Sequence, residues 1–208
     1  MKDIIIVSDF DGTITTEDTL YKFFNTLADS KWQEVEALWR NGEIGSKECL
    51  IRQFELVNNL NKNLVDKFCS TMQLDPYFKD FTEQNEYDFM IVSDGIDYFI
   101  NSILDNNDIK NINIISNHME FNEDGYLLTF PNEYNQCKIN AGTCKCKVID
   151  ELKRKYKKIF YIGDGQSDFC VSHKADKLFA KSSLYKYCKQ NNIDCIEYKT
   201  FKDIKISI

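Results

Sequence analysis

The sequence lacks the features that mark membrane-spanning and secreted proteins. No run approaches the roughly 20 consecutive apolar residues that a bilayer-spanning helix requires. The first residues do not combine a charged start with an apolar core, as a signal peptide does. Proline is scarce, with two residues in 208, as fits a globular composition. We therefore expect a cytoplasmic protein without a membrane partner.

Histidine and closely paired cysteines are too few for a structural zinc site. The chain has two histidines, His118 and His173, and its eight cysteines form no Cys-x-x-Cys pair. Such a site needs a closed set of four ligands, and Lys145 stands between the nearest thiols, Cys144 and Cys146. Reduced thiols are the default without a secretory signal. We expect these cysteines to behave as small hydrophobic residues.

The chain also lacks the positive charge that nucleic-acid binding requires. Its formal net charge is −7, whereas phosphate backbones attract basic surfaces. The basic run at residues 153–158 is the local exception. We interpret it as a solvated helix end, where cations suit the helix dipole. We therefore expect no nucleic-acid partner. A length of 208 residues predicts one α/β domain with a small additional part.

The first twelve residues contain the strongest signal that is present. The apolar run Ile4–Val7 leads directly to Asp9 and Asp11, followed by Gly12. Continuous apolar strands belong to sheets buried on both faces, so this run predicts a central parallel strand. Side chains at i and i+2 of an extended chain point the same way. Two carboxylates placed together favour a bound cation or a shared proton.

A long stretch without strand patterns follows, at residues 17–84. It contains apolar residues at helical spacing in four places and predicts amphipathic helices. The first of them starts at Thr16 or Asp18 as N-cap. An insert of this size directly after the first strand predicts a helical cap over a site. The expected inward faces are Leu20–Leu27, Trp32–Trp39, Cys49–Phe54 and Leu64–Phe68.

Strand patterns resume after residue 84 and alternate with helical ones. Alternation of this kind implies right-handed βαβ units and a doubly wound parallel α/β sheet. The turn residues 122–125 predict a small β-hairpin insert. We therefore expect a core formed by residues 1–16 and 85–208 and a helical cap formed by residues 17–84. The expected strands are 89–92, 112–115, 158–162, 178–180 and 194–197.

Polar residues follow three of these strands where each strand ends. They are Asp9 and Asp11, then Ser93 and Gly95, then Asp164 with Asp168. In open α/β sheets, the carboxyl ends of the strands are where ligands bind. Hard oxygen ligands suit Mg²⁺, which keeps several waters. Asp9, Asp164 and the backbone carbonyl near Asp11 could hold the ion and leave room for a phosphate.

Most of these groups also have an ordinary structural interpretation when taken singly. A Ser93-Asp94-Gly95 segment is usually a turn or a helix cap. Gly163-Asp164-Gly165 is a common turn sequence, and an isolated Lys145 is usually solvated. The order in which the groups follow the strands is what makes them a candidate site.

Taken together, the groups resemble the four motifs of the haloacid dehalogenase superfamily of phosphohydrolases. The motifs span nearly the whole chain, and the helical insert resembles the C1-type cap of that superfamily. The resemblance implies a phosphatase core that acts on a small phosphorylated metabolite with Mg²⁺. The four motifs are Asp9-Phe10-Asp11-Gly12-Thr13, Ser93, Lys145 and Gly163-Asp164-Gly165-Gln166-Ser167-Asp168.

The resemblance also implies roles for the residues that match the motifs. Asp9 is the nucleophile that forms an aspartyl-phosphate and is also a metal ligand. Asp11 protonates the leaving group, then activates water, and its backbone carbonyl contacts the metal. Asp164 is the remaining protein ligand of Mg²⁺, and Asp168 is a supporting residue that orients water or Lys145.

Phosphate binding is assigned to a second group of residues by the same resemblance. Ser93 and the backbone N–H groups near Asp94 and Gly95 hold the phosphoryl oxygens, and Lys145 pairs with the same charge. The nearest branch is that of the phosphoserine phosphatases. Within it the chain looks most like methionine-salvage phosphatases, which act on 2-hydroxy-3-keto-5-methylthiopentenyl-1-phosphate.

Two positions depart from these patterns and leave the substrate open. Asp94 stands where the methionine-salvage enzymes tend to have glycine, and its carboxylate either points away or weakens phosphate binding. Phosphoserine phosphatases hold the substrate carboxylate with a cap arginine, and Arg52 is the candidate in that region. Phosphoserine, phosphoethanolamine and phosphocholine therefore remain alternative substrates.

Two alternatives of other classes also remain. The same core supports phosphoryl transfer to a sugar, as in phosphomutases, and a retired scaffold could bind a metabolite without turnover. Retention of both Asp9 and Asp11 disfavours a non-catalytic protein. The sequence is compatible with a monomer or a homodimer.

Overall fold

The computed structural model describes residues 2–123 and 125–206. Among these residues, a seven-stranded sheet with the order β4-β3-β2-β1-β5-β6-β7 forms the centre of the molecule. All neighbouring strands are parallel except β3 and β4, which form an antiparallel hairpin. The strands are β1 (Lys2–Ser8), β2 (Asp88–Ile96), β3 (Asn113–Asn122), β4 (Gly125–Thr129), β5 (Tyr156–Gly163), β6 (Lys177–Ala180) and β7 (Ile196–Glu197).

Strand β1 occupies the centre of the sheet because its apolar side chains are buried on both faces. Ile5, Ile6 and Val7 expose 1% or less of their surface. The strand pairs with β2 on one side and with β5 on the other. The chain winds outward in both directions from β1, so the carboxyl end of β1 lies at a topological switch point of the sheet.

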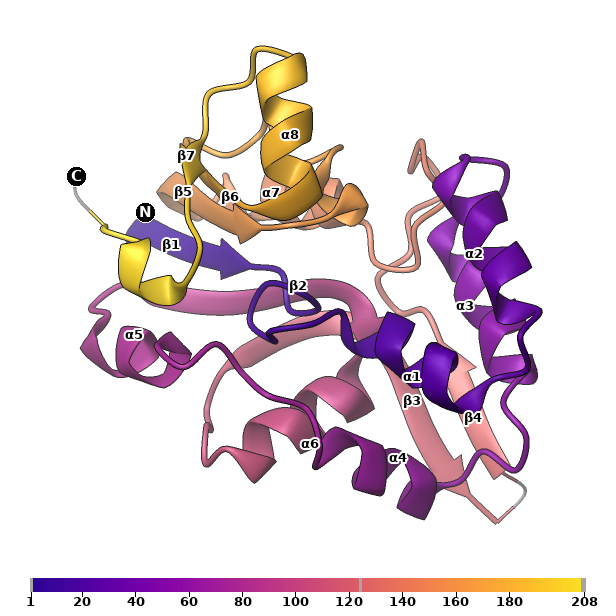
Figure 1. Cartoon of the computed structure of the whole chain (residues 1–208). Coiled ribbons are helices and arrows are strands. Elements are labelled where there is room, and N and C mark those ends of the chain that lie inside the picture. Colours follow the sequence, from indigo (N-terminus) through magenta and orange to yellow (C-terminus); the bar gives the residue numbers. More distant parts are fainter. Residues whose placement is uncertain (1, 124, 207–208) are drawn as a thin grey trace.

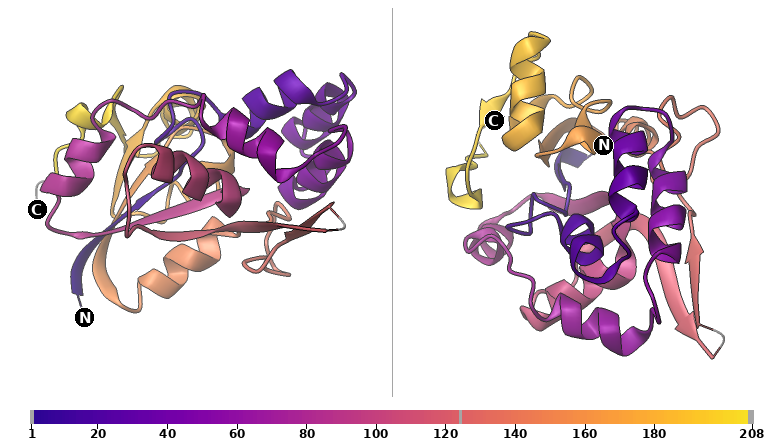
Figure 2. Two further views of the ribbon diagram at one scale, coloured as in Figure 1. Left: turned by 90° about the horizontal axis from the view of Figure 1, so that it is seen from below. Right: turned by 45° about the vertical axis from the view of Figure 1, so that its right-hand side comes forward.

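Helices cover both faces of the sheet. In the left view of Figure 2, α6 lies on one side of the sheet and α7 on the other. Residues of α7 and α8 pack in one apolar cluster, while α1, α3, α4 and α6 contribute to a second, larger cluster. The helices are α1 (Thr19–Leu27), α2 (Trp32–Arg40), α3 (Ser46–Glu55), α4 (Lys62–Cys69), α5 (Phe78–Gln84), α6 (Asp97–Asn106), α7 (Lys145–Leu152) and α8 (Ser182–Gln190), with short 3₁₀ turns η1 (Gln166–Asp168) and η2 (Phe201–Asp203).

The helices between β1 and β2 follow the amphipathic pattern of the sequence. Asp18 caps α1, because its side chain accepts a hydrogen bond of 2.9 Å from the backbone N–H of Tyr21. In Figure 1, α1, α2 and α3 gather on the side of the molecule toward which β1 points. Helix α5 lies elsewhere, since Phe78 packs edge-on against Phe201 with ring centroids 5.0 Å apart.

Two strands are longer than the apolar runs that predicted them. β2 continues through Ile96 with a register irregularity after Val92. β3 unites the predicted strand 112–115 with the first arm of the predicted hairpin, because one continuous strand pairs first with β2 and then with β4.

Helix α7 ends at Leu152, so the basic run at residues 153–158 begins directly after the helix end and continues into β5. None of the helices in the described ranges has the length and apolarity to cross a membrane.

Candidate active site

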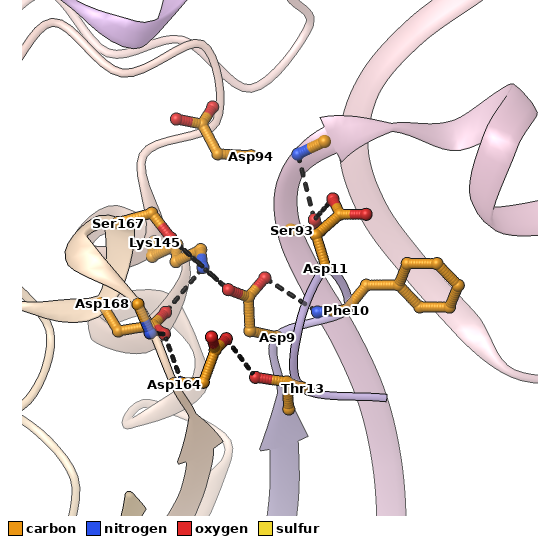
Figure 3. A network of polar contacts seen from close by, with 12 residues as sticks. Asp9, Phe10, Asp11, Thr13, Ser93, Asp94, Lys145, Asp164, Ser167 and Asp168 are labelled. Atoms are coloured by element: carbon orange, nitrogen blue, oxygen red, sulfur yellow. Dashed lines mark hydrogen bonds and ion pairs between the residues drawn. The ribbon is translucent and has the colours of Figure 1, made fainter. Parts of the chain in front are cut away.

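Asp9 lies where β1 ends, and its side chain is 6% exposed. One oxygen accepts a hydrogen bond of 2.8 Å from the backbone N–H of Phe10. The other lies 2.8 Å from the Nζ of Lys145. Both oxygens are therefore fixed by donors, which holds the carboxylate in one orientation at the carboxyl edge of the sheet. Figure 3 shows this network from close by.

Lys145 bridges two carboxylates at the start of α7. Its ammonium group is almost fully buried and lies 2.6 Å from Oδ1 of Asp168 as well as beside Asp9. The hydroxyl of Ser167 also contacts the ammonium at 3.0 Å and Asp9 at 3.4 Å. The two carboxylates raise the pKa of Lys145 although burial opposes this change. Lys145 therefore carries its charge at any physiological pH.

Asp168 is fully buried and has every oxygen engaged. Oδ1 accepts hydrogen bonds of 2.6 Å from both Lys145 and the hydroxyl of Tyr161. Oδ2 accepts from the backbone N–H groups of Asp164 and Gly165 at 3.1 and 3.2 Å. These bonds fold the turn after β5 around one carboxylate, which places Lys145 and Asp164.

Asp164 follows β5 and faces Asp9 across the strand ends. Its Oδ1 accepts a 2.7 Å hydrogen bond from the hydroxyl of Thr13. Gly12 stands close by with φ +73°, and a Cβ there would lie 2.7 Å from Oδ2 of Asp164. Glycine is needed at this position both for its backbone conformation and for the space that the carboxylate occupies.

Three carboxylates in the described residues lie close enough together to hold one cation. Asp9, Asp164 and Asp168 each offer an oxygen within 4.8 Å of the others. Asp168 has its oxygens taken by four donors, which leaves Asp9 and Asp164 as the better ligands. Oxygen ligands of this kind fit Mg²⁺. The carboxylate of Asp11 is not part of this group.

Asp11 turns toward β2 instead. The hydroxyl of Ser93 lies 3.5 Å from Oδ2 of Asp11 and accepts a 3.0 Å hydrogen bond from the backbone N–H of Gly95. A Cβ on Gly95 would lie 2.2 Å from the same oxygen of Asp11. The missing side chain at Gly95 therefore leaves the space in which the carboxylate of Asp11 lies.

Burial, together with the charge of neighbouring carboxylates, raises three pKa values at the site. Burial, followed by the charge of Asp168, raises the pKa of Asp9 well above 3.8 and that of Asp164 to about 6. Burial, followed by the charge of Asp18, raises the pKa of Asp11 to about 7. A cation bound among these carboxylates would favour their ionised forms and so oppose the shifts that burial and neighbouring negative charge cause.

The carboxylate of Asp94 points away from Asp9 in Figure 3. Its oxygens accept hydrogen bonds from the Ser46 hydroxyl, from the backbone N–H of Thr143 at 2.8 Å and from the Asn117 amide at 3.2 Å. The side chain is therefore engaged elsewhere, and what Asp94 leaves for a ligand beside Ser93 is its backbone.

A cavity of about 130 Å³ opens above the carboxylates and reaches α1, α2 and α3. Its walls are mixed, because acidic groups at the strand ends face apolar residues of the helices together with Asp18 and Glu36. Neither arginine nor lysine is among the lining residues of the described chain. Arg52 is instead exposed on α3 and pairs with Glu48 at 3.2 Å. The apolar lining comprises Leu20, Tyr21, Phe24, Trp39, Cys49 and Leu50.

Four residues contribute to the site without a signal that singled them out in the sequence. Tyr161 lies inside an apolar strand, and Thr143 and Asn117 lie in segments without a motif. Ser46 begins a predicted helix after Gly45 and lies in the segment 45–50 that resembles the methionine-salvage phosphatases, but neither feature indicated its contact with Asp94. Their roles depend on contacts between distant segments, which a single sequence does not show.

Comparison with known proteins identifies relatives that span the whole chain. The sequence profile of the family described as "Putative Phosphatase" matches residues 4–185. A protein of Bacillus pumilus (strain SAFR-032) named 2-hydroxy-3-keto-5-methylthiopentenyl-1-phosphate phosphatase is 30% identical over 210 residues, covering 99% of this chain and 90% of its own. A protein of the same name from Exiguobacterium sp. is 28% identical, covering 96% and 94%.

Solved structures show the same fold. A phosphoserine phosphohydrolase-like protein from Francisella tularensis superimposes with a TM-score of 0.66 at 20% identity, covering 98% of this chain and 97% of the other. A phosphoserine phosphatase solved as a phospho-aspartyl intermediate analogue gives 0.67 at 17% identity, with the same coverage. The chain therefore belongs to the "Putative Phosphatase" family and is a phosphoric monoester hydrolase with the phosphoserine phosphatase-like fold.

Proposed function

We propose that this protein hydrolyses a small phosphate monoester through a phosphoryl group held on Asp9. The observation that carries this proposal is the fixed orientation of the buried Asp9 carboxylate beside Lys145. In the first step an Asp9 oxygen bonds to phosphorus while the bond from phosphorus to the ester oxygen breaks. Water then attacks phosphorus, releasing phosphate and restoring the carboxylate.

Asp11 is proposed as the acid and base of the two steps. A pKa of about 7 leaves a large share of Asp11 protonated near neutral pH, as the first step requires. The proton passes to the leaving alkoxide, and the resulting carboxylate then takes a proton from the attacking water. Ser93 and the backbone at Asp94 and Gly95 bind the phosphoryl oxygens, and Lys145 compensates the charge.

The carboxylates of Asp9 and Asp164 and the backbone carbonyl of Asp11 would hold Mg²⁺. The ion supplies charge compensation for the phosphoryl group when it is bound. Asp168 orients Lys145 and the turn that carries Asp164, and it does not itself need to contact the ion. The proposal that Asp9 and Asp164 form the site is supported by their spacing.

The proposed substrate is 2-hydroxy-3-keto-5-methylthiopentenyl-1-phosphate. The relatives that cover the whole chain carry this substrate in their names. The cavity also suits its apolar methylthio end, because Phe24, Trp39 and Leu50 form a wall above the carboxylates. We propose that the helices of residues 17–84 act as the cap that provides this wall, over a core formed by residues 1–16 and 85–208.

An amine-bearing phosphate ester is the second candidate. Asp18 and Glu36 line the cavity together with Tyr21 and Trp39, and acidic and aromatic groups favour a cationic head group. Phosphoethanolamine and phosphocholine carry such a group. Phosphoserine is disfavoured, because its carboxylate would meet no arginine or lysine among the described lining residues.

A phosphate-release assay with Mg²⁺ separates these substrates. The panel contains the methylthio-ketose phosphate, phosphoethanolamine, phosphocholine and phosphoserine, each with wild type and with Asp9→Asn as the inactive control. We expect the highest kcat/KM for the methylthio compound. A higher value for either amine ester would support the second candidate, whereas an isomerised phosphate ester in place of free phosphate would identify a mutase and overturn the proposal.

The proposed setting of the enzyme is the cytoplasm. All eight cysteines lie in the described part of the chain as free thiols, which is the usual state in a reducing compartment.

A further inference from the structure

We propose that Asp94 is a positioning residue that holds the start of α3 over the catalytic strand ends. The Asp94 side chain contacts a different part of the molecule from its two neighbours in the sequence. Ser93 and Gly95 on either side face Asp11, whereas the Asp94 carboxylate reaches across to the first residue of α3, Ser46. One residue of β2 therefore links the proposed phosphate-binding segment to a helix of the cavity wall.

The contact is built from both oxygens of the Asp94 carboxylate. Oδ2 accepts from Ser46, while Oδ1 accepts from the Thr143 N–H and from the Asn117 amide. No cation in the described ranges forms an ion pair with this carboxylate. Hydrogen bonds from neutral donors to a buried charge are among the stronger ones in proteins, and losing one leaves the charge under-solvated.

Ser46 also contacts the segment 140–143, on the side away from β2. Its side chain is buried, and its hydroxyl accepts a 3.2 Å hydrogen bond from the backbone N–H of Gly142. The preceding Gly45 lies so close to the loop that an added Cβ would be 2.3 Å from the carbonyl oxygen of Asn140. The start of α3 is therefore seated between β2 and the segment 140–143.

The same segment leads into α7, whose first residue is Lys145. Asp94 thus joins three parts that meet at the cavity: the strand end with Ser93, the helix that contributes Leu50, and the loop before Lys145. Separating α3 from the core breaks the Ser46 bond and exposes the carboxylate to water. The bond favours the arrangement in which the cavity is covered before substrate binds.

This arrangement predicts a specific kinetic effect, which rests on the proposed function. If the covered state is populated in advance, substrate binding does not have to use its own binding energy to close the cavity. Weakening the bond raises KM by on the order of tenfold, the range expected for one charge-assisted hydrogen bond. For Ser46→Ala the kcat value stays within about twofold, because Ser46 is not among the proposed catalytic or phosphate-binding residues and release of product becomes easier.

The test uses Ser46→Ala, Asp94→Asn and the double variant of the full chain. Ser46→Ala deletes a single donor, and Asp94→Asn keeps the size but leaves one acceptor oxygen in place of two. Lys47→Ala is the matched control, because Lys47 pairs with Glu133 at the same junction in an exposed position and such pairs contribute little.

Two readouts decide the proposal. Hydrogen exchange without substrate is expected to accelerate at residues 46–50 and 140–143 in Ser46→Ala and Asp94→Asn, but not in β1, β5 or Lys47→Ala. Steady-state kinetics are expected to show the rise in KM, with the double variant no worse than the more affected single variant. Unchanged exchange, faster exchange throughout the chain, or additive losses in kcat would each overturn the role of Asp94. The exchange result is independent of the substrate, so it stands even if the proposed activity fails.

Discussion

At the residue scale, chemically identical carboxylates differ through what surrounds them. Asp9 has both oxygens held by donors and an ammonium group alongside. Asp11 lies against a hydroxyl and a glycine, with its pKa raised to about 7. The first environment suits the nucleophile proposed at Asp9, while the second suits the acid and base proposed at Asp11, because its raised pKa favours the protonated form near neutral pH. Asp168 is different again, because four donors occupy it and fix its neighbours.

Lys145→Ala is expected to lower both activity and stability. Its removal leaves Asp9 and Asp168 buried without their shared cation, and breaking a buried ion pair costs about 3 kcal/mol or more. Urea unfolding should therefore give a reduced free energy of unfolding, together with a kcat too low to measure with p-nitrophenyl phosphate. Lys147→Ala, two positions along, is the control. Wild-type behaviour of Lys145→Ala would transfer the predicted role to Lys147.

At the element scale, the irregular end of β2 matters most. The register shift after Val92 lets Gly95 approach Asp11 within a distance that excludes a side chain. Bulges at strand ends commonly re-aim side chains beside active sites.

Gly95→Ala tests this geometry. The added methyl group would lie 2.2 Å from Oδ2 of Asp11, so the carboxylate must move away from the position assigned to proton transfer. General acid–base catalysis contributes about 10²- to 10⁴-fold, and we expect kcat to fall within that range. Thermal unfolding should shift by only a few degrees. Retention of wild-type kcat in a folded Gly95→Ala variant would contradict the assignment of Asp11.

The sequence allowed the central strands and the first four helices of residues 17–84 to be predicted because their apolar spacing is regular, whereas α5 was not predicted. Val65 and Phe68 are buried on α4 as expected, and Asp18 caps α1. The length of β3 was not predictable, because its second half is set by pairing with β4 rather than by its own apolar pattern. The packing of α5 against Phe201 depends on residues over a hundred positions away.

The candidate site was likewise predictable from the sequence only in part. Asp9, Ser93, Lys145 and Asp164 stand at motif positions, and the structure brings them to one edge of the sheet. The hydrogen-bond partners of the Asp94 side chain could not be predicted from the sequence, because they lie on three separate segments. Local spacing reports which residues share a strand or helix face, but not which distant segments meet.

At the scale of the whole molecule, we expect the carboxylate cluster to make stability depend on pH and, through the proposed site, on Mg²⁺. The pKa values of Asp11 and Asp164 are raised from 3.8 to about 7 and about 6 in the folded protein. A group whose pKa is raised by folding contributes stability that is fully present below the unfolded value. That contribution is lost as the pH rises through the folded value.

The metal-free protein should therefore melt at a lower temperature at about pH 8 than at about pH 5.5. Mg²⁺ should raise the melting temperature more at the higher pH, because it binds the ionised carboxylates. Differential scanning fluorimetry with EDTA or with Mg²⁺ measures both effects, and Asp164→Asn should lose most of the response to Mg²⁺. An equal effect of Mg²⁺ at both pH values, or an unchanged response in Asp164→Asn, would contradict the proposed site.

The most direct test of the central claim is to look for the phosphoryl group on Asp9. Wild-type protein is mixed with a phosphate ester labelled in the phosphoryl group, with Mg²⁺, and quenched in acid within a single turnover. Peptide mass spectrometry then locates the label. We predict labelled Asp9 in wild type and in the Lys47→Ala control, and no label on the protein in Asp9→Asn. Release of phosphate from wild type without a labelled intermediate, or labelling of another residue, would contradict the account.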